Sequence, residues 1–320
     1  MTSFDVFNGD ADGICALHQL RLAEPRPDAQ LITGVKRDIK LLAQIKNTRQ
    51  AQVTVLDISL DSNREDLNTL LSAGCTIFYA DHHFAGDIPA NNALTAHIDP
   101  GSEVCTSLII NRLLEGRFRP WAVAAAFGDN LHHAATLAAA PLGMSDAELA
   151  TLRELGELLN YNGYGRTVDD LHFTPADLYL AVHEFEDPFA FCSQSKILEQ
   201  LRQGFNDDMT RARKNTPLND DAVGRIYRLP SEPWSRRVAG VFSNEKARER
   251  AELAHALLVD NGDDTFTVSV RAPLNNKTKA DILCRRFPTG GGRAGAAGIN
   301  QLAANQVDSF ILAFKEVFTP

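Results

Sequence analysis

The 320-residue chain contains 32 lysine and arginine residues against 41 aspartate and glutamate residues, which gives a formal net charge of −9 at pH 7. Proteins that track long nucleic acids bind them mainly through neutralised phosphates, so this acidic balance disfavours a partner that is a long strand or duplex. A short nucleotide held by a few local charges remains compatible with it. No apolar run approaches the roughly 20 residues that a membrane-spanning helix needs, so we expect no membrane partner.

The length and the cysteine pattern bear on domain number and compartment. At this length a single hydrophobic core usually divides, so we expect two domains. The five cysteines are scattered and never stand in Cys-x-x-Cys spacing, which is typical of reduced, buried thiols. The first residues lack the basic and apolar pattern of an export signal and enter a strand at once. We therefore expect a cytoplasmic protein.

Strands and helices alternate over the first part of the chain. Short apolar runs predict strands at 4–7, 31–35, 53–56 and 75–79. Helical patterns lie between them, at 16–22, 41–45 and 66–73. This alternation indicates an α/β fold, in which helices cover a parallel sheet.

The chain continues in the same domain to about residue 190. A short strand at 96–98 precedes a helix at 106–114, for which Ser102 or Thr106 is the candidate N-cap. Further helices are predicted at 121–140, 149–159 and 178–185. We assign residues 1–190 to this first domain.

The remaining third of the chain differs in pattern. A charged, helix-forming stretch at 193–216 predicts a linking helix, and we place the linker at 191–222. Beyond it we predict strands at 238–242 and 265–270 flanking a helix, a turn at 261–264, a helix at 279–287 and a glycine-rich stretch at 290–298. We interpret residues 223–320 as a smaller α+β domain.

Acidic and imidazole side chains follow several of the predicted strands. Asp10 and Asp12 come after the first strand, Asp57 directly follows the run at 53–56, and Asp81-His82-His83 follows the run at 75–79. Each has a plain alternative, such as a solvated turn for Asp10 and Asp12 or a helix cap for Asp57. Carboxyl ends of parallel strands meet at one edge of a sheet, however, and carboxylate with imidazole suits Mn²⁺, Fe²⁺ or Zn²⁺ better than Ca²⁺. The combination predicts a centre for two divalent metal ions.

The order of these motifs resembles the DHH phosphoesterase superfamily. Its four metal motifs are similar to Asn8-x-Asp10-x-Asp12-Gly13, Asp57, Asp81-His82-His83 and Asp129. The stretch from Gly290 to Gly298 resembles the glycine signature of the DHH-associated C-terminal domain. The resemblance covers nearly the whole chain in the right order, and it implies a parallel-sheet DHH domain, a linker helix and a smaller substrate-binding domain.

The resemblance also implies roles for particular residues. Asp57 would bridge two Mn²⁺ ions, with Mg²⁺ or another divalent metal as alternatives. The first ion would be served by Asn8 and Asp10, and the second by Asp12, His82 and Asp129. His83 would face the substrate phosphate, and Asp81 would orient the histidine pair. Phosphate binding by the second domain would involve Arg271, Gly291, Gly292 and Arg293.

The chain departs from the superfamily pattern at two of these positions. Asn8 stands where a histidine is usual, and an amide oxygen is a weaker donor to Mn²⁺ than an imidazole. His132 and His133, one helical turn beyond Asp129, either compensate or lie on a helix surface. Arg293 replaces the signature histidine, and its guanidinium can bind phosphate through two hydrogen bonds.

The function that follows is a metal-dependent phosphodiesterase, with metal-activated water as the nucleophile. Chemistry on the first domain and phosphate binding on the second favour dinucleotides or very short oligonucleotides, with hydrolysis of linear diguanylate (pGpG) to GMP as the specific hypothesis. A non-catalytic nucleotide sensor, a single-strand exonuclease and a pyrophosphatase are the alternatives. A homodimer is left open, and residues 161–166 either contact a base or form a helix-ending turn.

Overall fold

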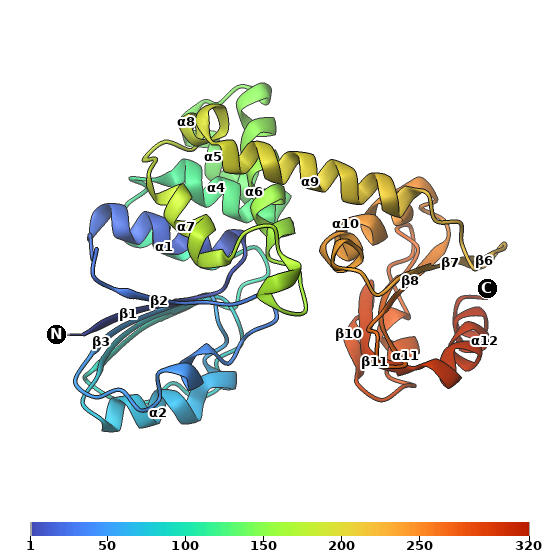
Figure 1. Cartoon of the computed structure of the whole chain (residues 1–320), viewed down its shortest axis with the longest axis horizontal. Coiled ribbons are helices and arrows are strands. Elements are labelled where there is room, and N and C mark those ends of the chain that lie inside the picture. Colours follow the sequence, from blue (N-terminus) through green and yellow to red (C-terminus); the bar gives the residue numbers. More distant parts are fainter. Residues whose placement is uncertain (1, 320) are drawn as a thin grey trace. The chain divides into compact units, whose positions relative to one another are not determined.

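The computed structural model describes residues 2–319, which form two compact units that divide between Gln203 and Gly204 (Figure 1). The division falls inside helix α9 (Lys196–Arg213), whose N-terminal part belongs to the first unit. A helix was predicted for this charged stretch. We describe each unit by itself.

The first unit is built on a sheet of five parallel strands in the order β2-β1-β3-β4-β5. Their bounds are β1 (Ser3–Phe7), β2 (Gln30–Ile32), β3 (Gln52–Leu56), β4 (Thr76–Asp81) and β5 (Leu94–Ile98). The chain moves outward from β1 to β2 and then returns to β3 on the other side of β1. In sheets with such a reversal, ligands bind in the crevice at the carboxyl ends of the two central strands. The predicted α/β class is confirmed.

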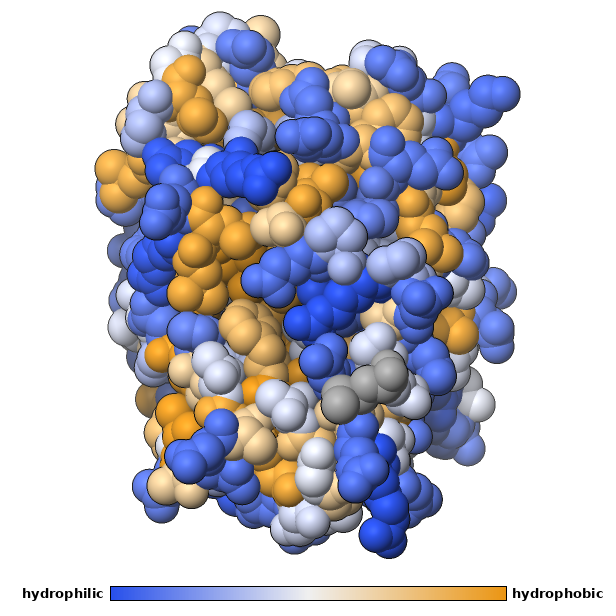
Figure 2. Space-filling model, turned by 90° about the vertical axis from the view of Figure 1, so that its left-hand side faces the viewer, coloured by the Kyte–Doolittle hydropathy of each residue, from blue (hydrophilic) through white to orange (hydrophobic). Residues whose placement is uncertain are grey.

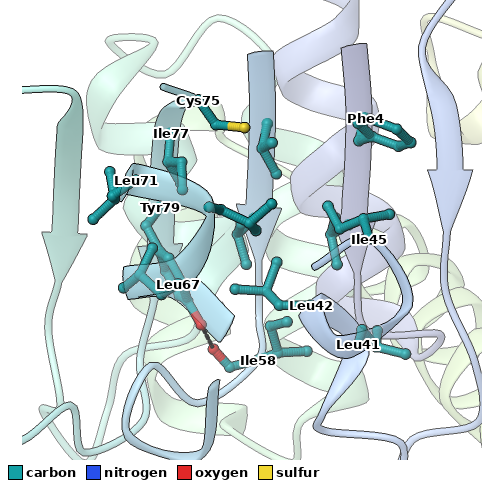
Figure 3. Packing of buried hydrophobic residues seen from close by; sticks show 14 of the residues in the cluster. Phe4, Leu41, Leu42, Ile45, Ile58, Leu67, Leu71, Cys75, Ile77 and Tyr79 are labelled. Atoms are coloured by element: carbon teal, nitrogen blue, oxygen red, sulfur yellow. Dashed lines mark hydrogen bonds between the residues drawn. The ribbon is translucent and has the colours of Figure 1, made fainter. Parts of the chain in front are cut away.

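On one face of this sheet, a hydrophobic cluster lies between the strands and two helices, the 3₁₀ helix η1 (Leu41–Gln44) and helix α2 (Arg64–Ser72) (Figure 3). Alternate strand residues such as Phe4 and Ile77 point into it, as the period-two geometry of strands requires. The hydroxyl of Tyr79 donates a 2.8 Å hydrogen bond to the carbonyl of Ile58, so the polar end of this buried ring is satisfied.

The opposite face is covered by helices, with α1 against the strands (Figure 1). These helices are α1 (Ala11–Ala23), α3 (Thr106–Leu113), α4 (Arg119–Gly128), α5 (His132–Ala139), α6 (Asp146–Asn162), α7 (Pro175–His183) and α8 (Pro188–Gln194). Arg21 of α1 forms a buried, two-pronged ion pair with Asp5 of β1, at 2.5 and 2.8 Å, and also bonds Thr54 of β3. A side chain at Gly156 would collide with the carbonyl of Ala124, so α6 can approach α4 closely only because this residue is glycine.

Several predicted boundaries in this unit were wrong. The helix predicted at 121–140 is broken between α4 and α5, where Asn130 adopts a left-handed backbone conformation with φ of +62°. The strand predicted at 31–35 ends at Ile32, and the helix at 41–45 is a short 3₁₀ turn. Neither Ser102 nor Thr106 is the N-cap of α3, because Cys105 occupies that position without a side-chain cap.

The second unit contains a six-stranded sheet in the order β10-β11-β9-β8-β7-β6. Its strands are β6 (Asn219–Asp220), β7 (Gly224–Leu229), β8 (Ala254–Asp260), β9 (Thr265–Arg271), β10 (Gly290–Arg293) and β11 (Ala296–Ala303). Among these described strands, the β7–β8 pair is parallel and the other pairs are antiparallel. One face packs on α11 (Ala280–Cys284) and α12 (Val307–Phe318), and the other packs partly on α10 (Pro233–Glu249). The predicted α+β character is observed.

Two predictions for this unit need correction. The apolar run at 238–242 is part of helix α10 and not a strand, because Pro233 starts the helix and Val238 and Phe242, four residues apart, are buried on one helix face. The glycine-rich stretch 290–298 forms an antiparallel hairpin of β10 with β11. The helix predicted at 279–287 is observed as the shorter helix α11.

The apolar character of the helices and the hydropathy of the surface bear on membrane contact. Within residues 2–319, no helix combines the length and the apolar character that crossing a membrane requires. Figure 2 shows hydrophobic patches interrupted by hydrophilic side chains on the side of the molecule that lies at the left in Figure 1. This mixture is ordinary, because roughly 55–60% of a folded protein's surface is apolar.

Candidate functional site

The loop after β1 holds Asp10 at the start of helix α1. Asp10 is the N-cap of this helix, and one of its carboxylate oxygens accepts hydrogen bonds from the backbone N–H groups of Asp12 and Gly13, at 3.0 and 3.1 Å. A side chain at Gly13 would collide with the carbonyl of Asn8, so the tight turn requires glycine. The carboxylate is thereby fixed at the positive end of a helix.

Asp12 points from α1 to the start of helix α3. Its two carboxylate oxygens accept hydrogen bonds from the backbone N–H groups of Thr106 and Ser107, both at 2.7 Å. Thr106, which we had considered as a cap, instead donates its hydroxyl to Asp57 at 3.1 Å. The first turn of α3 is therefore capped by a carboxylate from another helix, a contact that sequence patterns do not reveal.

Asp57 follows β3 in a left-handed backbone conformation, with φ of +59°. Its N–H donates to the carbonyl of Ala80, which extends the β3–β4 pairing by one residue and holds this strained conformation. Burial, followed by the neighbouring carboxylates of Asp12, Asp10 and Asp129, raises the pKa of Asp57 well above its usual value. A nearby cation is what would allow this carboxyl group to ionise fully.

The Asp81-His82-His83 sequence closes the site from the end of β4. His82 Nε2 lies 3.4 Å from Asp57 Oδ1 and 3.7 Å from Asp129 Oδ2. His83 Nδ1 donates to Asp81 Oδ1 at 2.7 Å. Burial of His83 opposes its charged form, but the hydrogen bond to Asp81, together with the negative charges of Asp81, Asp12 and Asp129, outweighs burial and raises the pKa of His83.

Lys36 lies among these carboxylates and was not anticipated from the sequence. Its Nζ lies 2.5 Å from Asp10 Oδ2, 3.1 Å from Asp129 Oδ1 and 2.9 Å from Asn160 Oδ1. Burial alone would lower the pKa of Lys36, but the charges of Asp10 and Asp129 raise it well above its ordinary value. The available signal was its position, because Lys36 directly follows the strand predicted at 31–35 and so lies at the same edge of the sheet.

The pKa values of the two carboxylate partners of Lys36 are shifted in opposite directions. Burial raises the pKa of Asp10, yet Lys36 and the N–H of Gly13 outweigh it and lower the pKa overall. For Asp129, burial dominates over Lys36 and the pKa is raised. The site thus holds one organic cation and more buried carboxylate charge than that cation can neutralise.

Two groups of side chains in residues 2–319 could hold a metal ion. Their ligand atoms lie within 4.8 Å of one another, and the groups are Asp57-His82-His83 and Asp12-His82-Asp129. His82 is common to both groups. Asp10 belongs to neither group.

The other candidates from the sequence lie outside this cluster. His132 and His133 belong to neither metal-compatible group and lie, partly or fully exposed, in the first turn of α5. Tyr161 is fully buried and shares a 2.7 Å hydrogen bond with His172. Asn162 is also buried, and it bonds the backbone of Phe173. These contacts favour a structural role for Tyr161 and Asn162.

The predicted phosphate-binding residues lie together in the second unit. In the strand register, Ala296 of β11 is opposite both Arg293 of β10 and Arg271 of β9. Gly291 lies further along β10, opposite Gly298, and a side chain there would meet nothing within 4 Å among the described residues. Arg271 Nε donates to the side chain of Asn244 in α10 at 2.8 Å, which fixes its guanidinium on the α10 face of the sheet.

No protein-family model matches the sequence, and the comparison with curated proteins finds no match. The comparison with solved structures, in contrast, finds matches. A RecJ exonuclease bound to manganese has a TM-score of 0.63 at 14% identity, with 98% of this chain and 89% of that chain covered. The chain has the DHH-domain fold.

Two further structures support this fold assignment. RecJ from Thermus thermophilus in complex with Mn²⁺ has a TM-score of 0.62 at 16% identity, covering 98% of this chain and 51% of that chain. The pGpG-specific phosphodiesterase PggH from Vibrio cholerae has a TM-score of 0.54 at 13% identity, covering 98% of this chain and 99% of that chain. In this chain the DHH-domain fold brings Asp12, Asp57, His82 and Asp129 together from the ends of different elements.

Proposed function

We propose that the protein is a divalent-metal-dependent phosphodiesterase that hydrolyses dinucleotides or very short oligonucleotides, with pGpG as the specific candidate substrate. The observation that carries the proposal is the group of buried carboxylates around His82 at the carboxyl ends of β1, β3 and β4. Such a group is costly to bury without compensating positive charge. DHH-fold structures with manganese and a DHH-fold phosphodiesterase support the same chemistry.

The residues present fit a divalent ion. Carboxylate oxygens of Asp12, Asp57 and Asp129 and the Nε2 atom of His82 would hold it, a mixed oxygen and nitrogen set that suits Mn²⁺. The pKa of Asp57 is raised, so positive charge added beside it would stabilise its ionised form. A bound divalent ion lowers the pKa of a coordinated water molecule and polarises a phosphoryl oxygen.

His83 is placed to act on the substrate rather than to fill the core. Its side chain is 43% exposed, while its Nδ1 is held by the fully buried Asp81. The hydrogen bond from Nδ1 orients the ring and stabilises the protonated form, so Nε2–H can donate to a phosphoryl oxygen or to the departing oxygen. In this proposal His83 is a catalytic residue and Asp81 is a positioning residue.

The second unit offers a phosphate-binding surface. Residues directly opposite in neighbouring strands point to the same side of a sheet, so Arg271 and Arg293 flank the small Ala296 on one face. Strand spacing separates their backbones by roughly 10 Å. Two guanidinium groups above a floor of small residues form a suitable cradle for a phosphate or for a phosphate with its sugar.

An exposed aromatic ring adjoins the candidate centre. Phe84 follows His83 directly and is 74% exposed. An apolar ring in this position has no packing role of its own, whereas aromatic side chains stack on nucleobases with little sequence preference. We propose that Phe84 stacks on a base of the substrate, which favours nucleotides over inorganic pyrophosphate.

The test is an Mn²⁺-dependent hydrolysis assay over mono-, di-, tetra- and longer nucleotides at fixed ionic strength. We expect kcat/KM to be highest for 5′-phosphorylated dinucleotides and to fall with length, because the net charge of −9 offers no basic track. A preference for long single strands would instead favour an exonuclease. Micromolar dinucleotide binding without Mn²⁺-stimulated turnover would favour a nucleotide sensor and refute the enzyme.

A further inference from the structure

We propose that the ammonium group of Lys36 occupies the position of the first of two metal ions, so that this DHH-fold centre binds a single divalent ion. The inference rests on the proposed function only in that one divalent ion binds beside His82. It replaces the two-ion centre that the sequence predicted with one organic cation and one metal.

The hydrogen-bonding capacity of Lys36 is filled by the site. An ammonium group has three N–H donors, and Lys36 Nζ has three oxygen partners, from Asp10, Asp129 and Asn160 at 2.5, 3.1 and 2.9 Å. Only a quarter of its side chain is exposed. These partners come from the start of α1, from the end of α4 and from α6, so the group bridges three elements of the first unit.

The backbone of Lys36 is held as well as its side chain. Its N–H donates to the carbonyl of Gly163 at 2.8 Å. Its carbonyl accepts a 3.3 Å hydrogen bond from the side-chain amide of Asn8. Asn8, predicted as a weak ligand of the first ion, therefore fixes the segment that delivers the lysine. The unusual residue at position 8 and the cation at position 36 are parts of one arrangement.

Both carboxylate oxygens of Asp10 are engaged while Lys36 is in place. One accepts the N–H groups of Asp12 and Gly13, and the other contacts Lys36. This agrees with the exclusion of Asp10 from both metal-compatible groups in residues 2–319. Among the described residues, the buried side-chain oxygen of Asn8 has no hydrogen-bond partner, and it is the group that would favour a second ion. A second ion at Asp10 would have to displace the ammonium group or lie beside it against charge repulsion.

Asp129 links the two cations. Its Oδ1 contacts Lys36, whereas its Oδ2 faces His82 Nε2 at 3.7 Å. One oxygen thus serves the lysine and the other remains available to the ion at His82. The lysine would orient this ligand and supply fixed positive charge to the substrate phosphate without a second metal.

The test is metal stoichiometry and electron paramagnetic resonance (EPR) of the full chain loaded with excess Mn²⁺. For the wild type we expect one tightly bound Mn²⁺ per chain and the six-line spectrum of an isolated ion. Lys36→Met should bind a second ion and show spin coupling between the two. Two control variants should still bind one Mn²⁺ per chain. Lys36→Arg keeps the charge, and Lys40→Met removes an exposed lysine from the same segment.

The outcomes separate this inference from the proposed function. Two spin-coupled ions in the wild type would overturn the inference whether or not Lys36→Met folds, and so would a folded Lys36→Met protein that still binds one. Absence of tight Mn²⁺ binding in the wild type and in every variant would refute both the metal centre and the inference built on it. One ion in the wild type without nucleotide hydrolysis would leave the inference standing and refute the proposed function.

Discussion

Arg271 and Arg293 lie opposite the same residue, Ala296, on the two strands that flank β11. The two arginines are 22 residues apart in the chain (293 − 271), and antiparallel pairing on both sides of β11 places them in one row. The row gives the second unit a paired guanidinium surface that neither arginine would provide alone.

Removing either arginine should weaken the use of dinucleotides. A charge-assisted contact to phosphate contributes about 1.5–3 kcal/mol, so Arg271→Ala or Arg293→Ala should lower kcat/KM on dinucleotides at least about tenfold. A chromogenic phosphodiester without a second phosphate should be affected much less. Arg286→Ala, which removes an exposed arginine paired with Glu316, is the matched control. Equal losses on both substrates would show that the arginines act on the fold or the metal centre.

Asp57→Asn should abolish hydrolysis while the fold is retained. Asparagine tolerates the left-handed conformation at this position and removes one of several mutually repelling carboxylates. The metal-free variant should therefore be at least as stable as the metal-free wild type, as measured by thermal unfolding in chelator. Retention of more than about a tenth of wild-type kcat, which corresponds to roughly 1.4 kcal/mol of barrier, would mean that Asp57 is not a metal ligand.

Asn8→His should not by itself create a two-metal centre. The substitution introduces an imidazole, a stronger donor to Mn²⁺, but it also removes the amide that holds the carbonyl of Lys36. We expect half-saturation by Mn²⁺ to change little in Asn8→His and a second, tighter site to appear only when Lys36→Met is added. Calorimetric titration of both variants with Mn²⁺ measures this directly. A second site in the single variant would contradict the dominant role of the lysine.

Phe84→Ala should raise KM for nucleotides more than it lowers kcat. Stacking of a base on an aromatic side chain contributes about 1–3 kcal/mol, and Phe84 is exposed, so its removal should leave the free energy of unfolding nearly unchanged. Phe84→Tyr should restore binding, and Ile88→Ala, an exposed apolar residue in the same loop, serves as the control. If KM for pGpG were unchanged in Phe84→Ala, the stacking role would be excluded.

His18 should make the fold sensitive to acid. It is fully buried against Trp121, with ring centroids 4.5 Å apart, and it shares a 3.2 Å contact with His183. Burial lowers the pKa of His18 to about 3. Because this pKa lies below that of an unfolded histidine, near about 6.5, its contribution to stability is complete above that pH and is lost as the pH falls toward the folded pKa.

The measurement is the free energy of unfolding of metal-free protein between about pH 7 and pH 4. The wild type should lose up to about 1.4 kcal/mol per pH unit more than His18→Met does below about pH 6.5. His133→Met, which replaces an exposed histidine, should behave like the wild type. Parallel curves for wild type and His18→Met would show that His18 titrates normally.

The amino-acid sequence alone determined the α/β class and the positions of the candidate ligands. Asp57 and Asp81 terminate strands whose apolar runs are visible locally, and a parallel sheet necessarily gathers such residues at one edge. The sequence failed where local pattern was ambiguous. The run at 238–242 satisfies strand and helix patterns alike, and only packing of Val238 and Phe242 against the second sheet decided for the helix.

Tertiary structure alone decided which side chains meet in the candidate site. Lys36 meets Asp129 across 93 residues of chain, and Asp12 caps α3 across 94. No local periodicity encodes such contacts, because they depend on where the loops after β2 and the end of α4 converge once the helices have packed. The same holds for the arginine row, which exists only through the pairing register of β9, β10 and β11. Local sequence specifies which groups reach the edge of a sheet, but the free energy of long-range packing decides which of them meet.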